Sequence, residues 1–205
     1  MKSDVNHTIL SIYDSHSISK DIEREGKNRG KLNPYFITGF SDAESSFIIG
    51  LSEDSKRKTG WIIALEFTIA VHEKERALLE SIKDFFSVGS ITKGGAGLIK
   101  YQVRSIAYLA IIIAHFDKYP LITQKWVDYQ LFRQAFEIVN RKEHLSINGL
   151  EKIIGLKASM NKGLSYKLKA AFPNVIPVQK PIKKLPPSLD PYWLAGFITG
   201  EGCFC

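Results

Sequence analysis

Hydrophobic and polar positions alternate along WIIALEFTIAV, residues 61–71. The odd positions are all apolar, whereas the even positions include Glu66 and Thr68. A period of two predicts a strand with one buried face. Residues 47–51 alternate similarly, and the polar loop SEDSKRKTG lies between the two stretches. Together they predict an antiparallel hairpin.

A second hairpin is predicted over residues 88–104, around GGAG. Between the hairpins, residues 73–86 carry apolar side chains at helical spacing, and further helices are predicted at about 105–117, 123–140, 147–161 and 165–171. No helix directly follows GGAG, which disfavours a nucleotide-binding loop. The outgoing strand of this hairpin is expected to bury one face and expose the other, formed respectively by Ile99, Tyr101 and Val103 and by Lys100, Gln102 and Arg104.

One sequence pattern occurs twice and aligns without a gap, as LNPYFITGFSDAESSF (32–47) and LDPYWLAGFITGEGCF (189–204). Chance would match about one position in sixteen, so this is an internal repeat. Each copy has a helix-capping residue followed by proline, which predicts a helix start. Seven of the sixteen positions are identical: Leu32/Leu189, Pro34/Pro191, Tyr35/Tyr192, Gly39/Gly196, Phe40/Phe197, Glu44/Glu201 and Phe47/Phe204.

Small residues lie four apart in each repeated helix, Gly39 and Ala43 in the first and Gly196 and Gly200 in the second. This spacing places them on one helical face. One interpretation is that each glycine packs on a core side chain. Its occurrence in both copies favours close packing of the two helices on each other.

Between the repeats, residues 173–188 contain five prolines and three lysines, which predicts a linker. Residues 1–31 lack the apolar segment of a signal peptide and are too acidic for a transit peptide, so we expect a poorly ordered extension. The predicted organisation is an extension (1–31), a first domain (32–172), the linker (173–188) and the start of a second domain (189–205).

Charge points to an anionic partner. The 205 residues contain 28 Lys plus Arg against 21 Asp plus Glu, giving a net charge of +7 and a pI near 9.3. Nucleic acid and membrane surfaces both fit, but the longest apolar run, residues 106–114, is too short to span a bilayer. The only cysteines, Cys203 and Cys205, form no disulfide framework and lack a second ligand pair for zinc, so a reducing compartment fits.

Glu44 and Glu201 end the two repeated helices. A carboxylate in the last turn meets the negative end of the helix dipole, which costs about 0.3–1 kcal/mol. If the helices pack in parallel, the two like charges converge and raise that cost. Solvated surface glutamates are the simpler interpretation, but the matched positions favour a shared divalent cation such as Mg²⁺, a combination suited to phosphodiester hydrolysis.

The polar face of the predicted sheet is the second candidate site. A twisted antiparallel sheet fits a DNA major groove, where lysine and arginine meet phosphates, and Thr68, Gln102 and Arg104 are candidates for base contacts. An ordinary solvated sheet face is the alternative interpretation. The basic residues expected on loops or on this face are Lys56, Arg57, Lys58, Lys93, Lys100 and Arg104.

The repeated stretches ITGFSDAES (37–45) and LAGFITGEG (194–202) resemble the two signature motifs of LAGLIDADG homing endonucleases. The similarity extends to LEFTIAVH, to HFDKYPLITQKWVDYQLFRQAF (115–136) and to EHLSINGLEKIIGLKASMNKGL, which resemble fungal mitochondrial double-motif enzymes. The resemblance implies an α+β fold. Residues 32–172 would form an αββαββα half with a four-stranded antiparallel DNA-binding sheet, and 189–205 would begin a second, incomplete half.

The resemblance also implies function. Family members hydrolyse both strands of a long double-stranded DNA target with a divalent metal, and they are typically encoded in mobile introns of organelle genes, so a mitochondrial location is expected. Glu44 and Glu201 would be catalytic and bind Mg²⁺, with the carbonyls of Ala43 and Gly200 as further ligands. The strand positions that would face DNA are Ser46, Ile48, Gly50, Ser52, Glu66, Thr68, Ala70, Ser90, Thr92, Lys100, Gln102 and Arg104.

Two departures from the family pattern create further expectations. Ser45 replaces the glycine that follows the glutamate, although Gly202 keeps it, so the Ser45 side chain is expected to crowd the metal or the DNA. The second half lacks its strands. The complete protein is therefore expected to be a monomer. This chain by itself would bind one half-site weakly, expose Trp193 or its neighbours, self-associate and make no double-strand breaks.

Two other functions remain open at this stage. The first is an RNA maturase that binds its host intron RNA, and the second is a DNA-binding module without catalysis. Net charge does not separate them from a nuclease. Intact glutamates favour the nuclease, and Ser45 slightly favours the maturase.

Overall fold

The computed structural model describes residues 32–183 and 186–201. The predicted N-terminal extension and the positions Gly202, Cys203 and Cys205 lie outside the described residues. The order of helices and strands matches the predicted order. The elements are α2 (Pro34–Glu44), β1 (Ser45–Glu53), β2 (Trp61–His72), η1 (Glu73–Glu75), α3 (Arg76–Phe86), β3 (Ser90–Lys93), β4 (Leu98–Val103), α4 (Ile106–Lys118), α5 (Lys125–Asn140), η2 (Glu143–Leu145), α6 (Ile147–Ser159), α7 (Tyr166–Ala171) and α8 (Pro191–Glu201).

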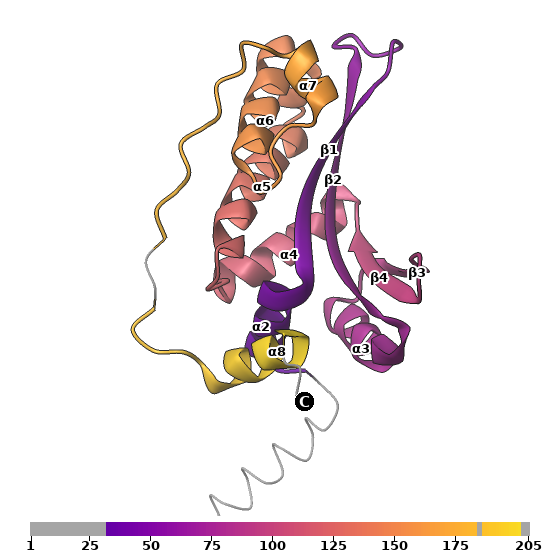
Figure 1. The fold of residues 1–205 in the computed structure, drawn as a ribbon, viewed down its shortest axis with the longest axis vertical. Helices are drawn as coiled ribbons and strands as arrows, with labels where there is room; N and C mark the ends of the chain where they lie inside the picture. The colour runs from indigo at the N-terminus through magenta and orange to yellow at the C-terminus, as the bar shows by residue number, and fades with distance from the viewer. Residues whose placement is uncertain (1–31, 184–185, 202–205) are drawn as a thin grey trace, which may run out of the picture. The chain divides into compact units, whose positions relative to one another are not determined.

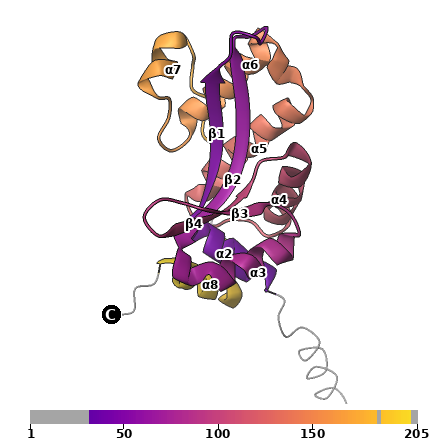
Figure 2. The ribbon, with the colours of Figure 1, turned by 90° about the vertical axis from the view of Figure 1, so that its right-hand side faces the viewer.

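The four strands form one antiparallel sheet in the order β1-β2-β4-β3, as expected for the α+β class. One row of paired residues crosses all four strands in this order: Ser46, Thr68, Gln102 and Ser90. The helices α4, α5 and α6 lie on one side of β1 and β2 (Figure 1). From the other direction the two long strands lie in front of these helices (Figure 2), so one sheet face is covered and the other is open.

The covered face carries the odd strand positions, as the alternation predicts. Phe47 lies at the centre of the core, with ring centroids 5.3 to 5.6 Å from those of Phe67, Phe116, Tyr129 and Phe132. Burying one such ring stabilises the fold by about 1.5–3 kcal/mol. Ile99, Tyr101 and Val103 are buried on this face as predicted.

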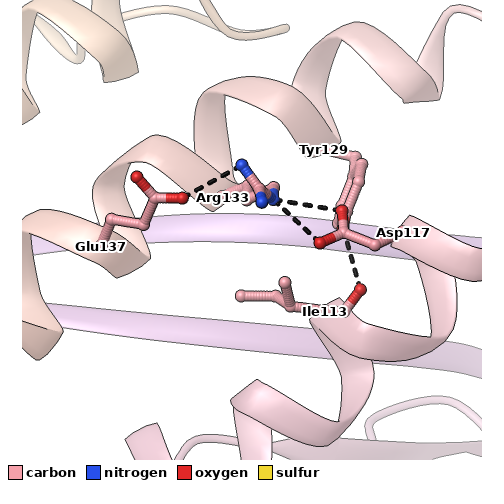
Figure 3. A network of polar contacts seen from close by, with 5 residues as sticks. All are labelled: Ile113, Asp117, Tyr129, Arg133 and Glu137. Carbon is pink, nitrogen blue, oxygen red and sulfur yellow. Dashed lines mark hydrogen bonds and ion pairs between the residues drawn. The ribbon is translucent and has the colours of Figure 1, made fainter.

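A polar network joins α4 to α5 (Figure 3). The Tyr129 hydroxyl lies 2.6 Å from Asp117 Oδ1 and 3.0 Å from the Ile113 carbonyl oxygen. The Arg133 guanidinium reaches Asp117 at 3.1 Å and Glu137 at 3.0 Å. Burial raises the pKa of Tyr129, so its hydroxyl stays protonated and donates. The network therefore ties the last turns of α4 to the first half of α5.

The proline- and lysine-rich segment 173–188 contains no helix or strand among its described residues, and it is docked at two places. Val178 N donates to the Gly155 carbonyl at 3.3 Å, and Ser159 Oγ donates to the Val178 carbonyl at 2.7 Å. Lys183 Nζ donates to the carbonyls of Leu121 and Thr123 at 3.0 and 3.3 Å. Its path along α6 is therefore fixed by hydrogen bonds. Across the part of the chain that the structure covers, every helix is too short or too polar to cross a bilayer.

Candidate functional site

The two repeated helices, α2 and α8, touch through their backbones. A Cβ added at Gly39 would overlap the Trp193 carbonyl, and one added at Gly196 would overlap the Phe36 carbonyl. Only glycine permits this approach at both positions. The close helix packing predicted from the repeat is therefore confirmed, and the two contacts are related by the repeat itself.

Capping fixes where each of these helices begins. Asn33 Oδ1 accepts from Tyr35 N, and Asp190 Oδ1 accepts from Tyr192 N, both at 2.8 Å. Such caps stabilise a helix by about 1 kcal/mol. Because the helices start at matched residues and cross at matched glycines, their last residues, Glu44 and Glu201, lie at the same end of the pair.

The environment of Glu44 indicates that the two carboxylates are close. Burial raises the pKa of Glu44, the charge of Glu201 raises it further, and Lys125 lowers it. A Cβ added at Gly200 would lie 3.1 Å from Glu44 Cγ and 3.6 Å from its Oε1. Glu44 is half-buried and Glu201 is exposed. The carboxylates therefore form a pair of like charges that is open to solvent on one side.

Lys125, the first residue of α5, is a site residue that the sequence analysis did not identify. Its Nζ donates to the carbonyls of Ser41 and Ala43, both at 3.0 Å. Burial lowers the pKa of Lys125, while the negative charges of Asp42 and Glu44 oppose that shift. The only sequence signal was the family resemblance of residues 115–136, because nothing local distinguishes this lysine from the chain's others.

The Asp42 carboxylate connects three parts of the structure by hydrogen bonds. Its carboxylate accepts from the backbone N of Ile122 and Thr123 at 2.6 and 3.2 Å, from Thr123 Oγ1 at 2.6 Å and from Trp193 Nε1 at 2.9 Å. It thereby joins α2 to the α4–α5 connection and to α8. These donors occupy the carboxylate, so Asp42 holds the site together and has little capacity left for a metal.

The expectation about Ser45 is wrong, whereas the expectation that α8 exposes Trp193 or its neighbours is met by the neighbours. Ser45 does not crowd the open face, because its Oγ donates to the Ser41 carbonyl at 2.6 Å and the residue is buried. Trp193 is only 5% exposed, since its indole reaches Asp42; the exposed apolar residues of α8 are its neighbours Tyr192, Leu194 and Ile198.

The donor set fits a hard divalent cation. Two converging carboxylates supply oxygen ligands with the negative charge that Mg²⁺ prefers. Among residues 32–183 and 186–201 there is no cluster of three or more His, Cys, Asp or Glu that would form an all-protein cage. Mg²⁺ usually keeps several water or phosphate ligands, so an incomplete protein set suits it. The Ala43 carbonyl, a predicted ligand, is shared with Lys125, and Gly200 packs against Ala43.

The predicted DNA-facing residues lie on the open sheet face or in its hairpin loops, but not all are accessible. Arg104 Nε donates to Glu66 Oε2 at 2.9 Å, so this arginine already has a carboxylate partner. Thr68 is a correction, because it is buried and its hydroxyl has no partner among the described residues. Gly50, Glu66, Ala70 and Gln102 are half-buried; the exposed positions are Ser46, Ile48, Ser52, Lys56, Arg57, Lys58, Ser90, Thr92, Lys93, Lys100 and Arg104.

Comparison with known proteins identifies the family. The LAGLIDADG endonuclease family model matches residues 37–136. The chain is 40% identical over 177 residues to the probable intron-encoded endonuclease 3 of Neurospora crassa. This alignment covers 85% of this chain and 33% of the relative. It is 37% identical over 93 residues to the probable intron-encoded DNA endonuclease aI1 of Mycosarcoma maydis, 77% of which is covered.

A similar solved structure also supports membership of this family. The meganuclease I-SmaMI bound to uncleaveable DNA superposes with a TM-score of 0.82 at 49% sequence identity, over 85% of this chain and 59% of that one. The chain thus spans about a third of the first curated relative and three-fifths of the solved structure. The sequence motifs, the paired helices and these comparisons agree that the chain belongs to the LAGLIDADG endonuclease family.

Proposed function

We propose that this chain supplies a DNA-binding sheet and the paired catalytic carboxylates of a site-specific, metal-dependent endonuclease that cuts both strands of double-stranded DNA. The observation that carries the proposal is the meeting of Glu44 and Glu201 at one end of two helices in backbone contact. The strand β1 follows α2 directly, so DNA lying on the sheet would bring its phosphates to these carboxylates.

Each group has a distinct part in the proposed reaction. Glu44 and Glu201 would hold Mg²⁺, which would neutralise the phosphate and activate water for attack. Lys125 places a cation beside the carboxylates, and its lowered pKa makes the ammonium a better proton donor than an exposed lysine. Lys93 and Lys100 hold phosphates, while Gln102 contacts a base edge.

The relatives support a proposal about where this endonuclease is encoded and located. The similar proteins are described as intron-encoded endonucleases of fungi, and we extend this to an organelle-encoded, mitochondrial protein. The maturase alternative loses the residue that favoured it, because Ser45 is buried and its hydroxyl is bonded to the Ser41 carbonyl. No other observation on the described residues favours intron RNA over DNA.

The decisive experiment is Glu44→Gln. Glutamine keeps the shape but removes the charge that holds the cation, so nicking of a plasmid carrying the intronless host gene should fall by roughly 100-fold or more, or about 2.7 kcal/mol. Calcium binding to the protein–DNA complex, measured by calorimetry, should weaken in parallel. Duplex binding should stay within about threefold, because phosphate contacts dominate affinity.

Glu151→Gln provides the matched control, since Glu151 is an exposed glutamate on α6, outside the site. It should leave nicking, calcium binding and duplex binding unchanged. Nicking by Glu44→Gln at the rate of this control would show that Glu44 is not a metal ligand.

A further inference from the structure

Two hollows beside the sheet are continuous. A cleft of about 650 Å³ contains Glu201, Ala43 and Lys180, and a groove of about 210 Å³ runs beside Ser46 and Ile48 of β1. Both are lined by Lys125, Asp128 and Asn161. Together they form one channel, called here the β1 trough, that leads from the carboxylate pair along the free edge of the sheet, since β1 is an edge strand.

Lysines line the β1 trough along its length. Lys125 and Lys157 are held in place, because each ammonium donates to backbone carbonyls; Lys157 Nζ lies 2.7 Å from the Ile49 carbonyl. Lys162 and Lys180 are exposed, and neither side chain has an ion pair or hydrogen bond within the residues that the structure covers. These two cations are available to a ligand.

The acids in the trough do not cancel these charges. Along β1 three lysines, Lys125, Lys157 and Lys162, line the groove against one carboxylate, that of Asp128. The Asp42 carboxylate lies in the cleft at the other end. Glu201 is one of the two paired carboxylates and lies at the end of the trough where we place the cation. The part of the trough along β1 is therefore positive.

The open sheet face is charged on one side only. On this face Lys100 lies on β4, and Lys93 ends β3 opposite Ile99, at a covered-face position. The open-face positions of β1 are uncharged: Ser46, Ile48, Gly50 and Ser52. Strands lie about 4.8 Å apart, so β1 and β3 are about 14 Å apart, close to the 12 Å width of a major groove. A sheet in the groove would place one phosphate backbone beside β3 and β4 and the other beside β1.

We propose that the β1 trough binds this second DNA backbone, with Lys162 and Lys180 contacting phosphates. The inference rests on the proposed function and deepens it. It also gives the segment 173–188 a role, because Val178 and Lys183 are docked on either side of Lys180 and hold it in the cleft. Lys162 and Lys180 add affinity without reading sequence, since both would contact phosphates.

The test is the double variant Lys162→Gln/Lys180→Gln in the full 205-residue chain, titrated with a random-sequence duplex at several salt concentrations. Each lost phosphate contact reduces the slope of log K against log salt by about 0.9, so the slope should become shallower by about 2. Base preference should not change. The control is Lys83→Gln/Lys118→Gln, which removes two lysines from α3 and α4 and should leave the slope unchanged.

Parallel measurement of Lys100→Gln separates this proposal from the proposed function. If Lys100→Gln lowers the slope by about 1 and the trough variant behaves like the control, the trough proposal is overturned while the sheet still binds DNA. If the parent chain binds no duplex, both proposals fail. A trough variant that loses affinity for structured RNA but not for duplex DNA would overturn the assignment to DNA.

Discussion

At the scale of single residues, Thr68 shows how sheet geometry modifies a strand pattern. It occupies an even position, on the open face as predicted, but it pairs with Ser46 on one side and Gln102 on the other and is buried between them. Its hydroxyl has no partner among the described residues. A buried hydroxyl without a partner costs about 1–3 kcal/mol, so Thr68 lowers the stability of the free protein.

We therefore predict that Thr68→Val stabilises the free protein by up to about 1 kcal/mol, because valine keeps the shape and removes the unpaired hydroxyl. Because the Thr68 hydroxyl is buried, base preference should stay unchanged. Urea denaturation and a competition panel of singly substituted duplexes measure the two effects. Thr92→Val, on the same face but exposed, should not gain stability. A Thr68→Val protein that is less stable than the parent would contradict this prediction.

At the scale of elements, the site depends on the crossing of α2 and α8. Gly196 is buried where its Cα faces the Phe36 carbonyl, and Trp193 stacks on Phe197 with centroids 5.0 Å apart while its indole reaches Asp42. Glu44 and Glu201 come close together because this contact fixes how α2 and α8 lie along each other.

Gly196→Ala should therefore detach α8 or push it away. The added methyl overlaps a backbone carbonyl, and forced overlap costs about 1–3 kcal/mol or more. We expect a lower melting temperature and red-shifted tryptophan emission as Trp193 becomes exposed. Gly95→Ala is the matched control, because a Cβ there meets nothing within 4 Å. Identical melting and emission for the two variants would refute the close contact.

His115 links α4 to α2 in the buried core. Thr38 Oγ1 donates to the Tyr119 carbonyl at 3.0 Å and so accepts from His115 Nε2 at 3.1 Å, which places a proton on Nε2. The ring lies edge-on to Phe85, Phe86 and Phe116. Burial lowers the pKa of His115 to about 4, because these rings cannot solvate an imidazolium.

The pH dependence of stability follows from this shift. Between about pH 6.5 and pH 4 the unfolded chain binds a proton at His115 that the folded chain does not, so the free energy of unfolding should fall as the pH falls, by up to about 1.4 kcal/mol per unit. Urea titrations across this window measure the slope. His115→Gln keeps a donor but cannot titrate, so its slope should be shallower; an unchanged slope would show that His115 does not cause it.

At the scale of the whole molecule, the described residues leave one face of α8 without a partner. Leu194 and Ile198 are four residues apart and 43% and 39% exposed, and Tyr192 is 57% exposed. Exposed apolar patches promote association. The chain also spans only about three-fifths of the matched I-SmaMI structure. This supports the expectation that the 205-residue chain self-associates through α8.

Sedimentation velocity over a range of concentrations tests that expectation. Leu194→Gln/Ile198→Gln should shift the chain toward monomer, since it replaces the apolar face of α8 by amides. Ile147→Gln/Tyr166→Gln removes two other exposed apolar side chains, on α6 and α7, and should leave association unchanged. A parent chain that sediments as a monomer at all concentrations would be inconsistent with an uncovered α8 face.

The sequence by itself determined the secondary structure and the carboxylate pair. Alternation over residues 61–71 defined which strand face is buried, because side chains point to opposite faces at successive residues. Asn33–Pro34 and Asp190–Pro191 located both helix starts, because capping is a local interaction. The repeat identified Glu44 and Glu201 together, since equal helix lengths and equal glycine positions bring equivalent residues to equivalent places.

Only the tertiary structure decided the surroundings of that pair. Lys125 is 82 residues from the Ala43 carbonyl it contacts, and Asp42 meets Trp193 across 151 residues; no local pattern encodes either contact. The burial of Thr68 and of Ser45 also depends on which elements pack side by side. The same is true of the positions of the lysines that line the β1 trough. Such contacts form only when the helices and the docked segment pack on the sheet, because they require precise distances between residues remote in sequence.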